Sequence, residues 1–267
     1  MNTPNMLAIE NVHPRDAFIS FEEGPHIYTV HGEQGYTSVT TWNHHHFPKF
    51  DSDKIIDGVM NNKKKNDPTY KYYGMSREQI AESWKKNGDA ASKAGTKMHY
   101  DIECFYNGLS VKNESIEFQY FQHFLADFPN LHSGKFRPYR TEWMVYWEEM
   151  KISGSIDMVF ENIEDGTLLI YDWKRVQEIV HENGFGKHAL TECISHLPDT
   201  NFWHYSLQLN MYKAILENKY AKKVVGLFLV ALHPDNYTNS YIRVEAHDLS
   251  TEINALLEVR KQELLMI

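Results

Sequence analysis

The sequence predicts an α/β fold, in which a mixed central sheet is flanked by helices and preceded by a β-rich N-terminal appendage. Three apolar runs of β-forming residues follow one another closely, at residues 136–148, 152–161 and 167–175. Amphipathic segments typical of helices lie before and after these runs, and residues 224–232 are almost continuously apolar. Such a continuous run is typical of a strand that is buried on both faces of a sheet.

The appendage is predicted from its alternation of extended segments and turn residues. Two strands, a turn and a third extended segment are expected at residues 18–21, 26–30, 32–35 and 36–41. The segment Asn87-Gly88-Asp89 is typical of a helix start. We therefore expect an N-terminal β-rich and helical elaboration at residues 1–87, packed on a core at residues 88–267.

The core elements follow from hydrophobic periodicity and from residues that end helices. Helices are expected at residues 90–106, 114–128, 203–218 and 251–265. A further strand is expected at residues 241–246, and the polar segment 176–201 is predicted to be a long loop.

Charged residues interrupt two of the predicted strands. Asp157 ends the run Gly154-Ser155-Ile156, and Asp172 and Lys174 flank Trp173 in the next strand. Sheets normally exclude such charges because desolvation costs free energy. Residues 162–166 read as a turn that makes the two strands an antiparallel hairpin, which brings Asp157 beside Asp172.

Two adjacent carboxylates with a nearby ammonium group are typical of a site for a hard cation and a phosphate ester. The carboxylates repel each other unless a cation lies between them, and Mg²⁺ or Mn²⁺ suits oxygen ligands. Lys174 could then orient a water or neutralise developing negative charge. The alternative is an ion pair between Asp172 and Lys174 at a solvated strand end, with Asp157 as a turn residue.

Three residues on the helix at 90–106 could extend this site. Gly95, His99 and Glu103 are spaced by four and therefore share one helix face. The glycine is unfavourable inside a helix, which suggests close approach of backbone or substrate. His99 is either a ligand or a structural residue, and Glu103 could orient it, bind a second ion or be solvated. Glu142 either reaches the same site or forms a salt bridge at a strand edge.

The composition restricts the function classes. The net charge of −9 (27 Lys and Arg against 36 Asp and Glu) argues against a protein that coats nucleic acid nonspecifically, but it allows a local basic channel. Only Cys104 and Cys193 are present, too few for a disulfide framework or a four-cysteine metal cluster. The candidate basic residues for such a channel are Lys63, Lys64, Lys65 and Lys71, and the aromatic residues among them and after them are Tyr70, Tyr72, Tyr73 and Trp84. The alternative is that residues 61–68 are only a solvated loop.

The order of four motifs resembles the PD-(D/E)XK nuclease superfamily. The motifs are Gly95-Thr96-x-x-His99, Gly154-x-x-Asp157, Asp172-Trp173-Lys174 and Gln208-x-x-x-Tyr212. They are similar to the RecB-like or Cas4-like branch, which includes the mitochondrial genome maintenance exonuclease and its viral and phage relatives. The resemblance covers roughly residues 88–232 and implies a restriction-endonuclease-like core.

The resemblance also implies roles for individual residues. His99, Asp157, Asp172 and the main-chain carbonyl of Trp173 would hold one or two Mg²⁺ or Mn²⁺ ions, and Lys174 would position the attacking water. Gln208 and Tyr212 would brace the site or contact the substrate. Lys63, Lys64, Lys65, Gly95, Thr96 and Tyr205 are candidate nucleic-acid contacts. The third motif has Asp where many relatives have Glu.

The site residues together with this resemblance predict a metal-dependent nuclease, and the resemblance implies a deoxyribonuclease, specifically an exonuclease acting on single strands or ends. The alternatives are an RNA endonuclease of the cap-snatching type and a nucleic-acid-binding member of the fold that does not cleave. DNA and a replication or recombination protein are the expected partners. No membrane segment is evident and the first residues lack an apolar leader, so we expect a soluble intracellular protein, in the cytoplasm or, if viral, in the host nucleus.

Overall fold

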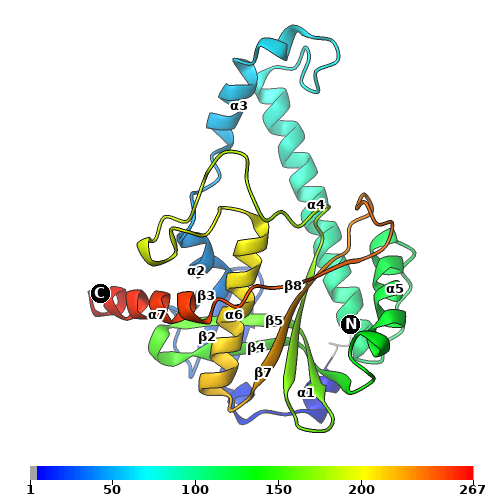
Figure 1. Ribbon diagram of the computed structural model, residues 1–267, viewed down its shortest axis with the longest axis vertical. Coiled ribbons are helices and arrows are strands. Elements are labelled where there is room, and N and C mark those ends of the chain that lie inside the picture. Colours follow the sequence, from blue (N-terminus) through cyan, green and yellow to red (C-terminus); the bar gives the residue numbers. More distant parts are fainter. Residues whose placement is uncertain (1–4, 267) are drawn as a thin grey trace. The chain divides into compact units, whose positions relative to one another are not determined.

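The computed structural model describes residues 5–266, which form two compact units (Figure 1). The first unit combines the chain up to Pro48 with the chain from Met98 onward, and the second comprises Lys49–Lys97. Residues 1–4, on which the expectation of no leader partly rests, lie outside the described residues. Within those residues, no helix is long and apolar enough to cross a membrane.

The first unit contains most of the helices and all strands of the described chain. Its N-terminal part comprises α1 (Met6–Glu10), β1 (Ile19–Glu22), β2 (Ile27–Val30), β3 (Thr37–Ser38) and α2 (Val39–His45). Its later part comprises α5 (Ile116–Leu131), β4 (Phe136–Trp147), β5 (Ile152–Asn162), β6 (Leu168–Lys174), α6 (Asn201–Lys219), β7 (Val224–Ala231), β8 (Ile242–Glu245) and α7 (Ser250–Leu265). The helix α4 (Arg77–Tyr106) begins in the second unit and ends in the first.

The large sheet is mixed, as the sequence predicted. β4 pairs along one edge of β5 and is antiparallel to it. On the other edge of β5, β3 pairs parallel near one end and β6 pairs antiparallel near the other. β7 then runs parallel to β6, and β8 runs antiparallel to β7. β1 and β2 form a separate antiparallel hairpin.

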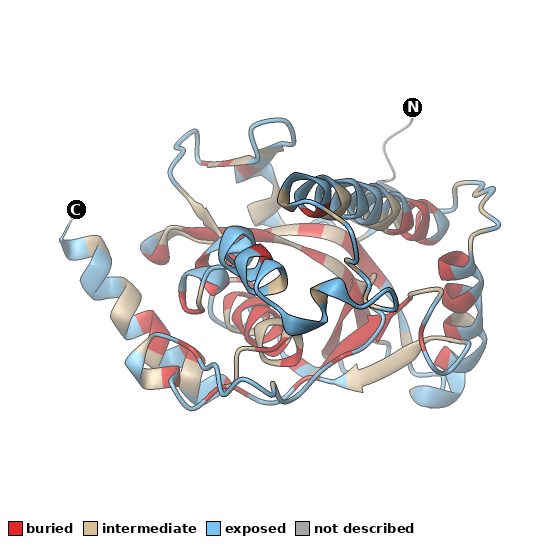
Figure 2. Ribbon diagram, turned by 90° about the horizontal axis from the view of Figure 1, so that it is seen from above, coloured by how far each residue is buried: buried red, intermediate tan, exposed pale blue. Residues whose placement is uncertain are grey.

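Helices cover both faces of this sheet, and Figure 2 shows the buried residues concentrated on its strands. On one face, Ile170 and Leu229 pack with residues of α6 such as Leu207. On the other face, aromatic side chains of α5 pack against Tyr171 and Trp173. The α/β class, the mixed sheet with flanking helices and the N-terminal two-stranded sheet predicted from the sequence are thus confirmed.

Two elements begin elsewhere than the sequence suggested. No helix starts at residues 87–89, because α4 is already helical from Arg77, and the expected boundary between residues 87 and 88 falls inside it. Ser76 and Gln79 cap this start reciprocally, since the Gln79 N–H donates to Ser76 Oγ at 3.2 Å and the Ser76 N–H donates to Gln79 Oε1 at 2.8 Å.

The predicted extended segment at residues 36–41 is also shorter than expected. Only β3 is extended, and α2 follows at once because Ser38 caps it, accepting a hydrogen bond from the Thr41 N–H at 3.1 Å. β3 pairs with β5, so the N-terminal region contributes a strand to the central sheet.

The second unit contains α3 (Ser52–Met60), a 3-10 helix at Lys63–Asn66 and the first part of α4. Arg77 ties α4 to α3, since its guanidinium pairs with Asp53 at 2.9 Å and also contacts Asp57. The Trp84 indole N–H donates to Tyr72 Oη at 3.0 Å. The unit therefore has internal polar contacts that hold its segments together.

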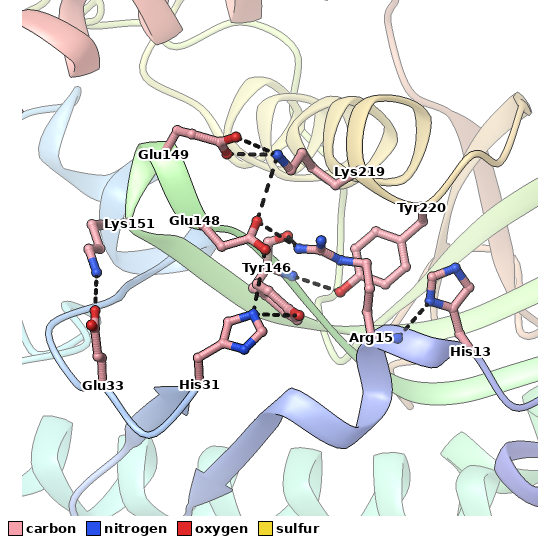
Figure 3. A network of polar contacts seen from close by, with 10 residues as sticks. All are labelled: His13, Arg15, His31, Glu33, Tyr146, Glu148, Glu149, Lys151, Lys219 and Tyr220. Carbon is pink, nitrogen blue, oxygen red and sulfur yellow. Dashed lines mark hydrogen bonds and ion pairs between the residues drawn. The ribbon is translucent and has the colours of Figure 1, made fainter.

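A polar network in the first unit joins the N-terminal region to the end of β4 and to α6 (Figure 3). The Arg15 guanidinium lies 3.9 Å from the ring centroid of Tyr146, and its Nη2 also donates to the Tyr146 carbonyl. The ion pairs Arg15–Glu148, Lys219–Glu149 and Lys151–Glu33 have N···O distances of 2.8, 2.7 and 2.8 Å. Each carboxylate in this Arg15–Glu148 network thus has a cation beside it.

Candidate metal centre

The hairpin of β5 and β6 brings the two expected carboxylates together. Met158 pairs with Tyr171 in antiparallel register, so Asp157 and Asp172 occupy the next opposing positions along the strands. The Trp173 N–H donates to Asp157 Oδ2 at 2.9 Å, which fixes the Asp157 carboxylate against β6. Asp172 is almost fully buried, and the Asp157 side chain is 12% exposed. The sequence-based expectation for this hairpin agrees with the observed register.

Glu142 faces the same place from β4. Its neighbours Thr141 and Trp143 pair with Met158 and Ile156, which sets Glu142 opposite Asp157. Glu142 has a φ of +42°, a left-handed conformation that costs a non-glycine residue about 1–2 kcal/mol. The Ser155 hydroxyl donates to Glu142 Oε2 at 2.8 Å. Backbone strain and a dedicated hydrogen bond in mid-strand are typical of a functional position.

His99 completes the group from the C-terminal part of α4. Its Nδ1 lies 3.5 Å from Asp157 Oδ2 and 3.8 Å from Glu142 Oε1. The buried Met98 on the same helix belongs to the core that contains the aromatic side chains of α5, Tyr171 and Trp173, and so helps to anchor this turn of the helix. The ligand atoms of His99, Glu142 and Asp157 all lie within 4.8 Å of one another, close enough for all three to bind one metal ion. We call these three residues the His–Glu–Asp cluster.

The electrostatics of the cluster reveal an excess of negative charge. Burial and the repulsion of Asp172 raise the pKa of Asp157 to about 7. Burial opposes the charged form of His99, but the attraction of Asp157 and Glu142 outweighs it and raises the pKa of His99 to about 9. Burial and Glu142 raise the pKa of Glu103 to about 7. The raised pKa values mean that Asp157, His99 and Glu103 retain protons to a higher pH than usual, and these protons reduce the negative charge of the group. A bound divalent cation would reduce the same negative charge.

The donor set fits a divalent cation with mixed nitrogen and oxygen ligands. Two carboxylates suit Mg²⁺ and Mn²⁺, and an imidazole is accepted more readily by Mn²⁺ than by Mg²⁺. Asp172, expected as a ligand, contacts Lys174 and Gln208 directly and lies beside the cluster, where its charge acts on both Asp157 and His99.

Lys174 lies on the same side of β6 as Asp172. Its Nζ is 2.7 Å from Asp172 Oδ2 and 3.3 Å from Gln208 Oε1, while Gln208 Nε2 donates to Asp172 Oδ1 at 3.2 Å. Lys174 Nζ also lies 4.6 Å from the ring centroid of Tyr205. Burial disfavours the ammonium, but the attraction of Asp172 and Asp157 outweighs this and raises the pKa of Lys174. The ammonium is therefore kept charged and held in place.

Tyr212 is a buried support for the site. It is 3% exposed, and a Cβ added at Gly154 would lie 2.8 Å from its ring and hydroxyl atoms. Gly154 is therefore needed for the close packing of α6 against β5, three residues before Asp157.

The structure brings together most of the residues singled out in the sequence. His99, Asp157, Asp172, Lys174, Gln208 and Tyr205 converge, with Glu142 in the cluster and Glu103 close enough to respond to both Glu142 and His99. The Trp173 ring is buried among the aromatic side chains of α5, and the backbone N–H of Trp173 donates to Asp157.

The remaining candidate residues belong to the second unit. Lys63, Lys64, Lys65, Gly95 and Thr96 all lie within Lys49–Lys97. A Cβ at Gly95 would meet no described atom within 4 Å, so the protein's own packing does not require this glycine.

The sequence leaves the place of Glu142 open. A salt bridge at a strand edge was an equal alternative, whereas the structure sets its carboxylate in the metal-capable group. Counting the register of the hairpin between β4 and β5 would have placed Glu142 opposite Asp157, but its left-handed backbone has no sequence signal.

No protein-family model matches this chain, and a search of curated proteins gives no match.

Proposed function

We propose that this chain is a metal-dependent nuclease that hydrolyses phosphodiester bonds of DNA, as an exonuclease acting on single strands or ends. The observation that supports this most directly is the convergence of the His–Glu–Asp cluster with a buried Lys174. A structural ion-pair cluster would balance its charges, whereas burial and the neighbouring Asp172 carboxylate raise the pKa of Asp157 in this cluster to about 7. The motif resemblance to RecB-like PD-(D/E)XK nucleases supports the same assignment.

His99, Glu142 and Asp157 would hold the cation, with Asp172 beside them as a further carboxylate. A bound Mg²⁺ or Mn²⁺ would supply Lewis acidity toward the phosphate and lower the pKa of a bound water. Lys174 would orient the attacking water or neutralise negative charge that develops on the phosphate oxygens. Gln208 would hold the Lys174 ammonium and the Asp172 carboxylate in register, because it contacts both.

The preference for DNA and for single strands or ends rests on the motif resemblance. A replication or recombination protein is the corresponding proposed partner. The same donor set would also serve an RNA endonuclease, so the substrate must be tested directly.

The test is digestion of end-labelled single-stranded DNA, duplex DNA and RNA by the purified protein with Mn²⁺ or Mg²⁺. We expect stepwise shortening of single-stranded DNA or of duplex ends, and no product with EDTA. The variant Asp157→Asn should be inactive, while Glu149→Gln, which removes a carboxylate that is 62% exposed and outside the site, should remain active. Cleavage confined to RNA would favour the endonuclease alternative, and no cleavage of any substrate would contradict the proposal.

A further inference from the structure

The second unit carries a charge opposite in sign to the rest of the chain. Lys49–Lys97 contains eleven Lys and Arg residues against seven Asp and Glu residues, a net charge of +4. The whole chain has a net charge of −9, so the remaining residues together carry −13. The acidic composition of the whole chain therefore conceals a compact unit of net positive charge, and a charge of this sign favours phosphate-rich ligands.

Most acidic side chains of this unit are occupied by structural contacts. Asp51 caps α3 by accepting from the Lys54 N–H, and Asp67 accepts from the Thr69 N–H and hydroxyl. Asp53 and Asp57 contact the same guanidinium, that of Arg77. By contrast, among the described residues no carboxylate lies within ion-pairing distance of Lys63, Lys64, Lys71 or Lys86.

Aromatic side chains lie within the same segment as the unpaired lysines. Tyr70 and Tyr72 have ring centroids 5.8 Å apart, and Lys71 Nζ lies 5.4 Å from the Tyr72 centroid. The hydrogen bond from Trp84 holds the Tyr72 hydroxyl. Tyr73 is 50% exposed, so its ring is accessible to a ligand.

A specific contact holds the lysine run against the tyrosine run. The Lys65 ammonium donates to the Met75 carbonyl at 2.6 Å, which closes residues 63–75 into one structured segment. Within it, the Tyr70 and Tyr73 N–H groups donate to the carbonyls of Asp67 and Tyr70 at 2.9 Å. We call residues 63–75 the Lys–Tyr segment. Its cations and rings are thus presented together on one unit.

We propose that the Lys–Tyr segment binds an unpaired nucleic-acid strand, with phosphates contacting Lys63, Lys64 and Lys71 and a base stacking on Tyr73. This rests on the proposed nuclease function. Phosphate neutralisation requires cations that lack carboxylate partners, and base stacking requires an accessible ring. A duplex would satisfy the cations but would offer no free base faces to the ring, so a single strand fits the combination better.

The first experiment measures binding of a fluorescent oligothymidylate of about 20 nucleotides in EDTA, so that no cleavage occurs. The variant Lys63→Ala/Lys64→Ala/Lys71→Ala is compared with Lys135→Ala/Lys151→Ala/Lys261→Ala, which removes the same charge from the other unit. We expect the slope of log affinity against log salt to fall by about 2 for the first variant only, from about 0.7 per lost phosphate contact. Equal slopes for the two variants would overturn the proposal.

The second experiment isolates stacking with Tyr73→Ala and the conservative control Tyr73→Phe. We expect Tyr73→Ala to bind oligothymidylate roughly five-fold more weakly, and Tyr73→Phe to bind it as the unmodified protein does. Neither change should affect binding to an abasic strand of the same length. An equal loss on abasic and base-containing strands, or no loss at all, would overturn the assignment of Tyr73.

These measurements separate this proposal from the proposed nuclease function. Binding in EDTA does not depend on the His–Glu–Asp cluster, so a chain without cleavage activity could still show the expected losses. Conversely, a chain that cleaves DNA but whose binding is indifferent to both sets of variants would retain the nuclease proposal and lose this one. Thermal unfolding of each variant checks that the second unit remains folded.

Discussion

The Arg15–Glu148 network and the His–Glu–Asp cluster are both built from carboxylates and cations of distant segments, yet their charge balance is opposite. In the network, ion pairs with Arg15 and Lys219 outweigh burial and lower the pKa values of Glu148 and Glu149. In the cluster, burial and neighbouring carboxylates raise the pKa of Asp157 to about 7. The first group is complete within the protein itself, whereas the second would be completed by a bound cation.

We interpret this difference as the contrast between a structural polar group and a proposed functional one in the same molecule. Both lie in the first unit, and both use side chains contributed by β4 and its continuation. Only the cluster includes a residue with left-handed backbone in mid-strand, Glu142. If the contrast in charge balance corresponds to a contrast in function, matched substitutions in the two groups should have different effects.

The largest expected effect is the loss of DNA cleavage in the variant Asp157→Asn. This change keeps an acceptor for the Trp173 N–H but removes a cluster charge, so we expect the rate to fall by about three orders of magnitude or more. Steady-state assays with saturating Mn²⁺ measure it. Glu148→Gln, the matched change in the network, should alter the rate little, and comparable losses in both variants would remove the distinction.

A smaller loss is expected for Lys174→Ala. In the proposed mechanism the ammonium acts on water or on the phosphate and does not bind the metal, so the rate should fall about 10²-fold to 10³-fold while Mn²⁺ affinity is retained. Calorimetric titration with Mn²⁺ alongside turnover gives both quantities. Loss of metal affinity with a rate restored by excess metal would assign Lys174 to metal-site structure instead.

Removal of the imidazole by His99→Ala should act on metal choice. We expect Mn²⁺ affinity to fall by about tenfold or more and Mg²⁺ affinity to fall less, because Mg²⁺ prefers oxygen ligands. The ratio of the two affinities, measured for both proteins by titration, is the readout. A ratio that does not change would return His99 to a structural role.

The smallest effects concern stability without metal. Asp157 has a folded pKa raised to about 7 from an ordinary value near 3.8, so its ionisation removes stability as pH rises through that window. Asp157→Asn should therefore have a larger free energy of unfolding than the unmodified protein at pH 8, and the advantage should disappear at pH 4. Glu148→Gln should instead lower stability at pH 8 by about 1 kcal/mol, because it breaks a satisfied pair. Chemical denaturation in EDTA at both pH values checks the two signs, and a shared sign would contradict the comparison.

The sequence was sufficient for the strands that carry the site. The two apolar runs predicted β5 and β6, and the short turn between them predicted their pairing. Charged residues are rare in such strands, so Asp157, Asp172 and Lys174 indicated a candidate site there. The helix with His99 was also predicted from its periodicity. Local patterns thus located most of the candidate site.

Other features depended on contacts that a local pattern does not contain. The start of α4 was placed late because Asn87 and Gly88 are typical of a helix start, yet they lie within a helix that is capped at Ser76. The change from β3 to α2 depends on one hydroxyl, that of Ser38. The division of the chain into two units, with Lys49–Lys97 as the second, follows from tertiary contacts. The composition of the whole chain does not show this division.

The backbone of Glu142 has an evolutionary consequence. At a φ of +42°, glycine would be the residue of lowest conformational energy, and Glu142→Gly would relieve the protein of that penalty. A lineage selected only for thermal robustness would drift toward glycine here and lose a carboxylate of the cluster. If the proposed function holds, retention of glutamate would record a stability–activity trade-off at one position, and related chains that keep the fold but carry glycine at this position would lack that activity.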